Sequence, residues 1–223
     1  MTDNCENNSC SVDKKENDIN LKYHWENVYE NKPNEKLGWF EVDLSPSLNL
    51  IEKTGLNHSA SILNIGAGNT TLIDELLKLG YTNIIATDIS EIALNKLNER
   101  LKSQAVNYIV DDLTKPKHLT NIQPVDLWID RAVLHFFTDE KDQNTYLNLL
   151  KNKVKKDGYV LLAQFNLNGA QKCSGLPVKR YDKTILSKKL GNDFKLIDDF
   201  DYIYTMPSGD KRPYVYTLFK KVK

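Results

Sequence analysis

The sequence predicts a doubly wound α/β fold, in which a mostly parallel sheet carries helices on both faces and ends in an antiparallel C-terminal strand. Short apolar runs alternate with amphipathic segments along most of the 223 residues, which is typical of parallel sheets with right-handed crossovers. The apolar runs are nearly continuous, as expected for strands covered on both sides. The last two strand-like runs are joined by a short turn, so they must be antiparallel.

The first half of the sheet consists of two strand–helix units. The run ASILNI at 60–65 precedes a segment at 70–80 whose Leu and Ile residues recur at helical spacing. The run TNIIATD at 82–88 precedes a second helix that begins after Ser90, a suitable N-cap. One unit therefore repeats the other, and their strands should lie parallel.

The remaining elements complete the sheet and cover it. Further strands are expected at 106–112, 125–130 and 158–165, with a helix at 140–154. After Arg180 the pattern changes to a helix at 181–191 and strands at 194–206 and 212–221, joined by the turn PSGD. Helices at 21–30 and 44–55 precede the first strand.

Length and composition predict one soluble domain with a short tail. Residues 1–20 are acidic and poor in apolar residues, which predicts a disordered tail, and residues 21–223 should form a single domain. No apolar run could cross a bilayer, and the N-terminus lacks the apolar core of a signal peptide. Cys5, Cys10 and Cys173 suggest neither a disulfide framework nor a metal site. We therefore expect a cytoplasmic protein that binds neither membrane nor metal.

A glycine-containing turn follows the first strand, in the sequence ILNIGAGNTT. Gly66 and Gly68 can adopt dihedral angles closed to other residues and let a ligand approach the backbone. Asp88 ends the second strand 22 residues after Gly66, where its carboxylate could accept hydrogen bonds from both hydroxyls of a ribose. Thr71 replaces the third glycine that a dinucleotide turn requires. An adenosine-bearing ligand without phosphate, such as S-adenosylmethionine, fits better than NAD.

In the order of its motifs the chain resembles the class I S-adenosylmethionine-dependent methyltransferases, which have a Rossmann-like fold. The motifs are ILNIGAGNT, IIATDIS, YIVDDL, VDLWIDRAVLHFF and GYVLLAQF, and the similarity extends over 21–223. The C-terminal segments resemble a small bacterial-type, type 12-like subgroup without an assigned substrate. The resemblance implies an N-terminal helical cover at 21–58, a cofactor-binding half at 59–166 and a substrate-side half at 167–223.

The resemblance also implies which residues bind the cofactor. Those assigned to its methionine and ribose portions are Gly66, Ala67, Gly68, Asp88, Asp130 and Arg131. Those assigned to its adenine are Ile89, Asp112 and Leu113, with Asp111 a weaker substitute for Asp112. Asn64 departs from the family, which most often has an acid there, and Thr70 replaces a frequent third glycine.

Two residues after the fourth strand are the candidates for catalysis. His135 lies near the expected active-site edge and could act as a base, or could simply pack beside Phe136 and Phe137. Arg131 could bind an anionic group of the substrate, or could pair with Asp130.

Aromatic residues precede the first strand. Trp25, Tyr29 and Trp39 could form the core face of a helix and its neighbour, or could cover the sulfonium charge of the cofactor, and Tyr29 and Trp39 are the stronger candidates for that contact.

The predicted function is methyl transfer to an unidentified acceptor, with a small molecule favoured because no appended recognition domain is evident. The alternatives are a protein or RNA methyltransferase and a non-catalytic S-adenosylmethionine-binding protein. Residues 1–150 carry 14 Lys and Arg against 23 Asp and Glu, and residues 151–223 carry 16 against 7. The basic C-terminal third is compatible with RNA as the methyl acceptor. No RNA-binding module is apparent, however, so a nucleic-acid substrate is disfavoured. The oligomeric state stays open.

Overall fold

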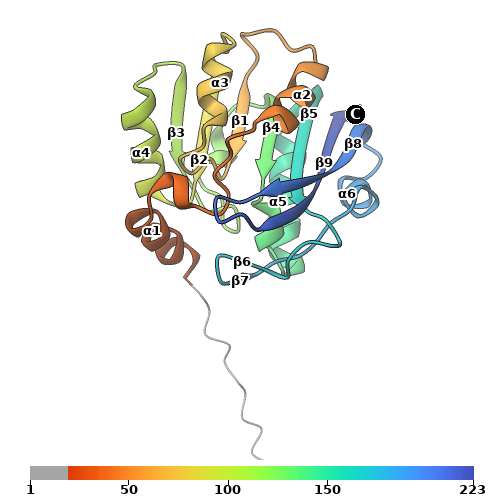
Figure 1. The fold of residues 1–223 in the computed structure, drawn as a ribbon. Helices are drawn as coiled ribbons and strands as arrows, with labels where there is room; N and C mark the ends of the chain where they lie inside the picture. Colours follow the sequence, from red (N-terminus) through yellow and green to blue (C-terminus); the bar gives the residue numbers. More distant parts are fainter. Residues whose placement is uncertain (1–19) are drawn as a thin grey trace, which may run out of the picture.

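The computed structural model describes residues 20–223 and confirms the predicted fold class. A seven-stranded sheet has the order β3-β2-β1-β4-β5-β9-β8 (Figure 1). Strands β1 to β5 are parallel, and β9 runs antiparallel to both β5 and β8. The predicted tail at 1–20 lies outside the described residues, except for Asn20.

The strands of the sheet lie close to their predicted positions. Their bounds are β1 Ile62–Ile65, β2 Ile84–Asp88, β3 Val106–Val110, β4 Val125–Arg131, β5 Val154–Phe165, β8 Phe194–Thr205 and β9 Lys211–Lys221. The largest difference is at β5, which begins four residues before the predicted strand. A small hairpin that the sequence pattern does not reveal, β6 Lys172–Cys173 and β7 Leu176–Pro177, follows β5.

Helices cover both faces of the sheet. The α-helices are α1 Leu21–Asn31, α2 Ser45–Lys53, α3 Leu72–Lys78, α4 Glu91–Leu101, α5 Glu140–Lys153 and α6 Lys183–Leu190. Short 3-10 helices lie at η1 Asn34–Lys36, η2 Leu119–Asn121 and η3 Leu134–Phe136. None of the helices in residues 20–223 is long and apolar enough to cross a membrane.

The core has two layers because the buried strands alternate their side chains between the two faces. In β4, Leu127 and Ile129 pack in the layer that contains α2, α3 and α4, whereas Trp128 packs in the layer of α5 and α6. Burial on both faces explains why the strands read as continuous apolar runs. A third cluster joins α1 to α4 through Tyr29 and Ala93.

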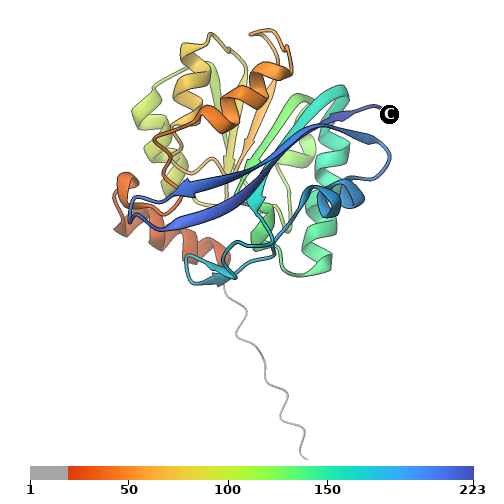
Figure 2. The same ribbon diagram turned by 45° about the vertical axis from the view of Figure 1, so that its right-hand side comes forward.

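Two segments that are distant in the sequence meet at the carboxyl edge of the sheet. The long β8–β9 hairpin reaches across the molecule towards the segment that contains η1 (Figure 2). The two touch at Gly38, where an added Cβ would lie 2.7 Å from Cε of Met206 at the hairpin tip. The hairpin and the N-terminal segment therefore close over the ends of the parallel strands.

Candidate functional site

A cavity of about 300 Å³ opens at the carboxyl ends of β1, β2 and β4. Its walls come from α1 and η1, the turns after the parallel strands, the β6–β7 hairpin and the tip of the β8–β9 hairpin. In doubly wound sheets, ligands bind where the strand order reverses, and here the reversal lies between β1 and β4. The cavity therefore lies where such a fold places its ligand.

The turn after β1 requires both of its glycines. Gly66 and Gly68 have φ angles of +56° and +52°, which side chains with a Cβ rarely adopt. A Cβ on Gly66 would lie 2.1 Å from Cγ2 of Val133, and one on Gly68 would lie 2.2 Å from the Tyr29 hydroxyl. Gly66 lines the cavity, whereas Ala67 lines a smaller neighbouring one. The protein's own side chains thus pack against the turn and fix its shape.

Asp88 stands at the end of β2 with its carboxylate fixed by the backbone. One oxygen accepts a hydrogen bond from the Gly68 N–H at 2.8 Å, and the other accepts from the Ser90 N–H at 2.9 Å. Each oxygen keeps a second lone pair. Burial raises the pKa of Asp88 to about 6, and the backbone N–H groups of Ser90 and Gly68 oppose this rise. At neutral pH the carboxylate is ionised and could accept both hydroxyls of a ribose.

The structure distinguishes the two acids after β3. Asp111 accepts hydrogen bonds from the backbone N–H groups of Lys117, His118 and Leu119, so it supports the start of η2. Asp112 is half-buried, and within residues 20–223 its Oδ1 accepts two hydrogen bonds, both from Thr114, while its Oδ2 accepts none. Asp112 lines the cavity together with two apolar side chains, Ile89 and Leu113. This arrangement fits an adenine ring with its amino group near Asp112.

Asp130 was predicted to bind the methionine and ribose portions of the cofactor, but in the structure it lies in the core. It is 0% exposed and accepts four hydrogen bonds, from the Val133 and Leu134 N–H groups, the Tyr146 hydroxyl and the Gln164 amide. Both carboxylate oxygens are engaged inside the protein, and Asp130 is absent from the cavity wall. It shapes the turn after β4 rather than lying open to a ligand.

Arg131 lines the cavity and pairs with Glu41, not with Asp130. Its Nε lies 2.8 Å from Glu41 Oε1, and its Nη1 donates to the Trp39 carbonyl at 3.1 Å. Burial alone would lower the pKa of Arg131, but the Glu41 charge raises it above its usual value. The guanidinium also lies 4.8 and 5.0 Å from the ring centres of Tyr204 and Tyr214. Its buried Nη2 has no hydrogen-bond partner within residues 20–223.

Asn64 lies near Arg131, beside the glycine turn. Both residues line the smaller cavity of about 40 Å³, together with Glu41 and Thr71. The buried Oδ1 of Asn64 has no partner in the part of the chain that the structure describes. An acceptor and a donor are therefore left unsatisfied at one place, and buried polar groups are usually paired. The amino and carboxylate groups of an amino acid could satisfy Asn64 and Arg131 respectively.

His135 does not reach the cavity, so the proposed base is not supported. Its side chain is 0% exposed and packs against Phe136 and Phe165 at ring-centre distances of 4.4 and 4.6 Å. Burial, with a smaller contribution from the Arg131 charge, lowers the pKa of His135 to about 3. The imidazole is therefore neutral and inaccessible, as in the packing alternative. Its neighbour Phe136 lines the cavity instead.

The aromatic residues of the N-terminal segment form one wall of the cavity. Trp25 lies edge-on to Trp39 and Phe136, with ring-centre distances of 5.5 and 5.0 Å, and Tyr29 lies 5.8 Å from Trp39. All four line the cavity. The residues pack against one another and also face the ligand space, so the two alternatives considered from the sequence are compatible.

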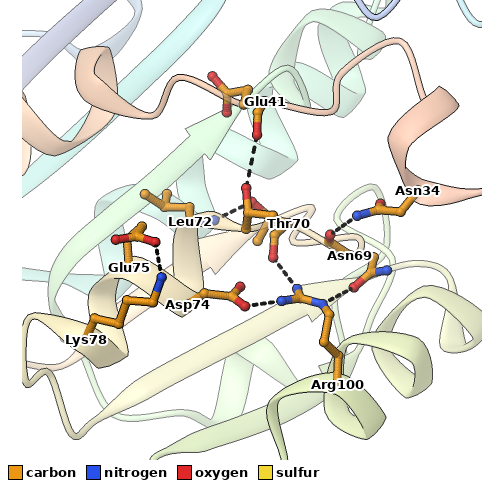
Figure 3. Close-up of polar contacts among 10 residues, drawn as sticks. Asn34, Glu41, Asn69, Thr70, Leu72, Asp74, Glu75, Lys78 and Arg100 are labelled. Carbon is orange, nitrogen blue, oxygen red and sulfur yellow. Dashed lines mark hydrogen bonds and ion pairs between the residues drawn. The ribbon is translucent and has the colours of Figure 1, made fainter.

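Polar contacts hold the glycine turn from two sides (Figure 3). From α4, Arg100 donates to the Asn69 side chain at 3.1 Å and to the Thr70 carbonyl at 2.6 Å, and also pairs with Asp74. From the N-terminal segment, Asn34 donates to the Asn69 carbonyl at 3.0 Å. These contacts stabilise a turn that has Thr70 in place of a third glycine.

Several residues of the site were not predicted from the sequence. Glu41 partners Arg131, Phe165 and Tyr214 line the cavity, and Lys172 and Met206 extend its wall. The only sequence signal for Glu41 is an acid at the end of the apolar run GWFE. The others lie far along the chain, and only the tertiary fold brings them to the site.

Comparisons with known proteins agree with this geometry. A family model described as a methyltransferase domain matches residues 56–206. The chain is similar to EEF1A lysine methyltransferase 2 of Danio rerio, with 24% identity over 164 residues, 66% of this chain and 70% of that protein. The corresponding Mus musculus protein is 24% identical over 169 residues, 69% of this chain and 68% of that protein.

Solved structures show the same fold. A SAM-dependent methyltransferase from Anabaena variabilis has a TM-score of 0.74 and 16% identity, covering 92% of this chain and 96% of that chain. The N-methyltransferase NodS from Bradyrhizobium japonicum, solved with S-adenosyl-L-homocysteine, has a TM-score of 0.68 and 13% identity, covering 92% and 100%.

Proposed function

Because the chain belongs to the methyltransferase-domain family and is a class I S-adenosylmethionine-dependent methyltransferase, we propose that it methylates a lysine side chain of a protein. The observation that carries this proposal is the similarity to EEF1A lysine methyltransferase 2, which extends over about two thirds of both chains. EEF1A is accordingly the first substrate to test.

This proposal replaces the small-molecule acceptor predicted from the sequence, which is wrong. The absence of an appended recognition domain favoured a small molecule, yet the relatives named for lysine methylation of a protein match over most of this compact domain. A protein segment can be bound by the rim of the cavity itself.

The residues of the site fit S-adenosylmethionine. Asp88 would accept from its ribose hydroxyls, and Asp112, Ile89 and Leu113 would surround its adenine. Asn64 and Arg131, with their unsatisfied Oδ1 and Nη2, would bind its amino-acid end. When bound, the cofactor supplies a methyl group on a sulfonium, which is already activated for displacement.

The remaining wall suits an amine acceptor. A lysine must lose its proton to solvent water before its nitrogen can attack a methyl carbon, and apolar surroundings lower the pKa of an amine. The wall is rich in aromatic side chains, namely Trp25, Trp39, Phe136, Phe165 and Tyr214. Such surroundings favour the neutral amine, and aromatic faces attract the methylated ammonium that forms. The protein then contributes mainly by positioning the acceptor and excluding water.

The test is methylation of purified EEF1A with isotopically labelled S-adenosylmethionine, followed by mass spectrometry of its peptides. We expect label on the Nζ of a lysine. Label on another residue type would contradict the acceptor. A lack of label on EEF1A, together with labelling of other proteins at lysine, would contradict only the choice of EEF1A.

A further inference from the structure

Four cationic side chains line the cavity and also reach solvent at its mouth, and we call them the basic rim. They are Lys32, Lys36, Lys172 and Arg212. Lys32 follows α1, Lys36 ends η1, Lys172 begins β6 and Arg212 lies near the start of β9. The three lysines are exposed, and Arg212 is about one third exposed. Four segments of the chain thus contribute positive charge to one opening.

Most of the positive charge of the basic rim is not paired with an acid in residues 20–223. None of its lysines forms a salt bridge within residues 20–223, and Arg212 approaches Asp210 only to 3.9 Å. Some exposed lysines elsewhere in the described part of the chain form ion pairs, such as Lys155 with Asp126 at 2.9 Å and Lys183 with Asp199 at 3.1 Å, and the lysines of the basic rim belong to those that do not. The basic rim is therefore available to a binding partner.

The acids that line the cavity are less exposed than the lysines of the basic rim. Asp88 and Asp111 are buried and already accept hydrogen bonds from backbone N–H groups. Asp112 is the third, and its Oδ1 is bound to Thr114. A partner that approaches from solvent therefore meets the exposed lysines before the acids, and their charge acts over about 8 Å at physiological ionic strength.

On the basis of the proposed function, we propose that the substrate segment carries acidic residues on both sides of its acceptor lysine. A lysine alone would be repelled by the basic rim, because the two have like charge. Flanking carboxylates would pair with Lys32, Lys36, Lys172 and Arg212 while the lysine enters the aromatic cavity. The rim would thus select among the many lysines of a protein surface.

An acidic peptide fits the site better than RNA, which would also be attracted to positive charge. Single-stranded RNA is bound on aromatic faces that are open for stacking. Here Trp25 is packed edge-on between Trp39 and Phe136, and Tyr29 also packs against Trp39. These rings pack against one another in the cavity wall and do not form a row of open stacking faces.

The test measures peptide binding separately from methylation. Fluorescent peptides with one lysine flanked by glutamates, glutamines or arginines are titrated with the S-adenosylhomocysteine-loaded protein, and an oligouridine serves as competitor. We expect the glutamate peptide to bind at least about tenfold more tightly than the glutamine peptide, with an advantage that shrinks as salt is added.

Matched triple variants assign the effect to the rim. In Lys32→Gln/Lys36→Gln/Lys172→Gln the preference for glutamates should disappear. In the control Lys141→Gln/Lys156→Gln/Lys195→Gln, which removes the same charge from exposed lysines outside the cavity wall, it should persist. Circular dichroism and cofactor titration check that both variants fold and bind the cofactor.

Three results would overturn the inference: equal binding of all peptides, a preference that survives in the rim variant, or stronger binding of oligouridine than of the glutamate peptide. Methylation of the same peptides is measured independently. Lysine methylation without any flank preference would contradict only this inference. Flank-dependent binding with no lysine methylation of peptides or proteins would contradict the proposed function instead.

Discussion

The substitution Asp88→Asn tests how the site recognises its cofactor. Asparagine keeps the size of the side chain but removes the charge and one of the two acceptor oxygens. In the structure those oxygens are 2.8 and 2.9 Å from the Gly68 and Ser90 nitrogens and have capacity for two further hydrogen bonds. Loss of one charge-assisted bond to a ribose hydroxyl costs about 2–3 kcal/mol, so the Kd should rise about 30- to 160-fold.

Calorimetric titration with S-adenosylhomocysteine measures this effect, and a ligand variant separates it from damage to the turn. The wild-type protein should bind the 2′-deoxy analogue at least about tenfold more weakly than S-adenosylhomocysteine. Asp88→Asn should discriminate much less between the two ligands. As a control, Asp126→Asn alters a carboxylate that accepts from the Ser61 N–H at 2.8 Å, outside the cavity wall, and should leave affinity unchanged. Equal loss of affinity in both variants, or undiminished discrimination in Asp88→Asn, would refute the assigned role.

Four further predictions follow from the structure. The pKa of Asp88 is raised to about 6, and its ionised form is the hydrogen-bond acceptor. Cofactor affinity should therefore fall as the pH is lowered below about 6, by up to about tenfold per pH unit. An affinity that does not change with pH would contradict this. Gly68→Ala should lower the free energy of unfolding by about 1–2 kcal/mol because of its positive φ, with part of the added clash relieved by Tyr29→Phe in a chemical denaturation series. His135→Phe should retain most of its turnover, because the imidazole is buried away from the cavity; a loss of about 100-fold or more at unchanged cofactor affinity would restore it as a base. Arg100→Ala should raise the KM for the cofactor several-fold with a smaller change in kcat, because it removes the hydrogen bonds to Asn69 and Thr70. A change in kcat alone would argue against a positioning role for Arg100.

The arrangement of the sheet could be predicted from the sequence because the signals for its strands are local. Each buried strand is a short apolar run, and the turn and acid that follow β1 and β2 stand at fixed places in the sequence. Gly66 and Asp88 could therefore be placed at one sheet edge without any knowledge of tertiary contacts. The β6–β7 hairpin could not be predicted from the sequence, because its strands have two residues each and contain no alternating pattern.

The limits of sequence reasoning are clearest after β4. The pattern places His135 at the active-site edge, but the hydrogen bonds from Val133 and Leu134 to Asp130 set the turn that decides which side chain faces the cavity. Phe136 faces it, and His135 enters the core. The ion pair between Arg131 and Glu41 could not be predicted either, because Glu41 is 90 residues away in the chain and only folding brings the two side chains within 2.8 Å.

The distribution of label in a fractionated cell extract tests the central claim most directly. The protein is incubated with extract and S-adenosylmethionine labelled in its methyl group, and protein, RNA and small-molecule fractions are then analysed separately. Lysine methylation of a protein predicts that label enters the protein fraction and is recovered as methyllysine after hydrolysis. Label recovered only in metabolites or in RNA would contradict the account.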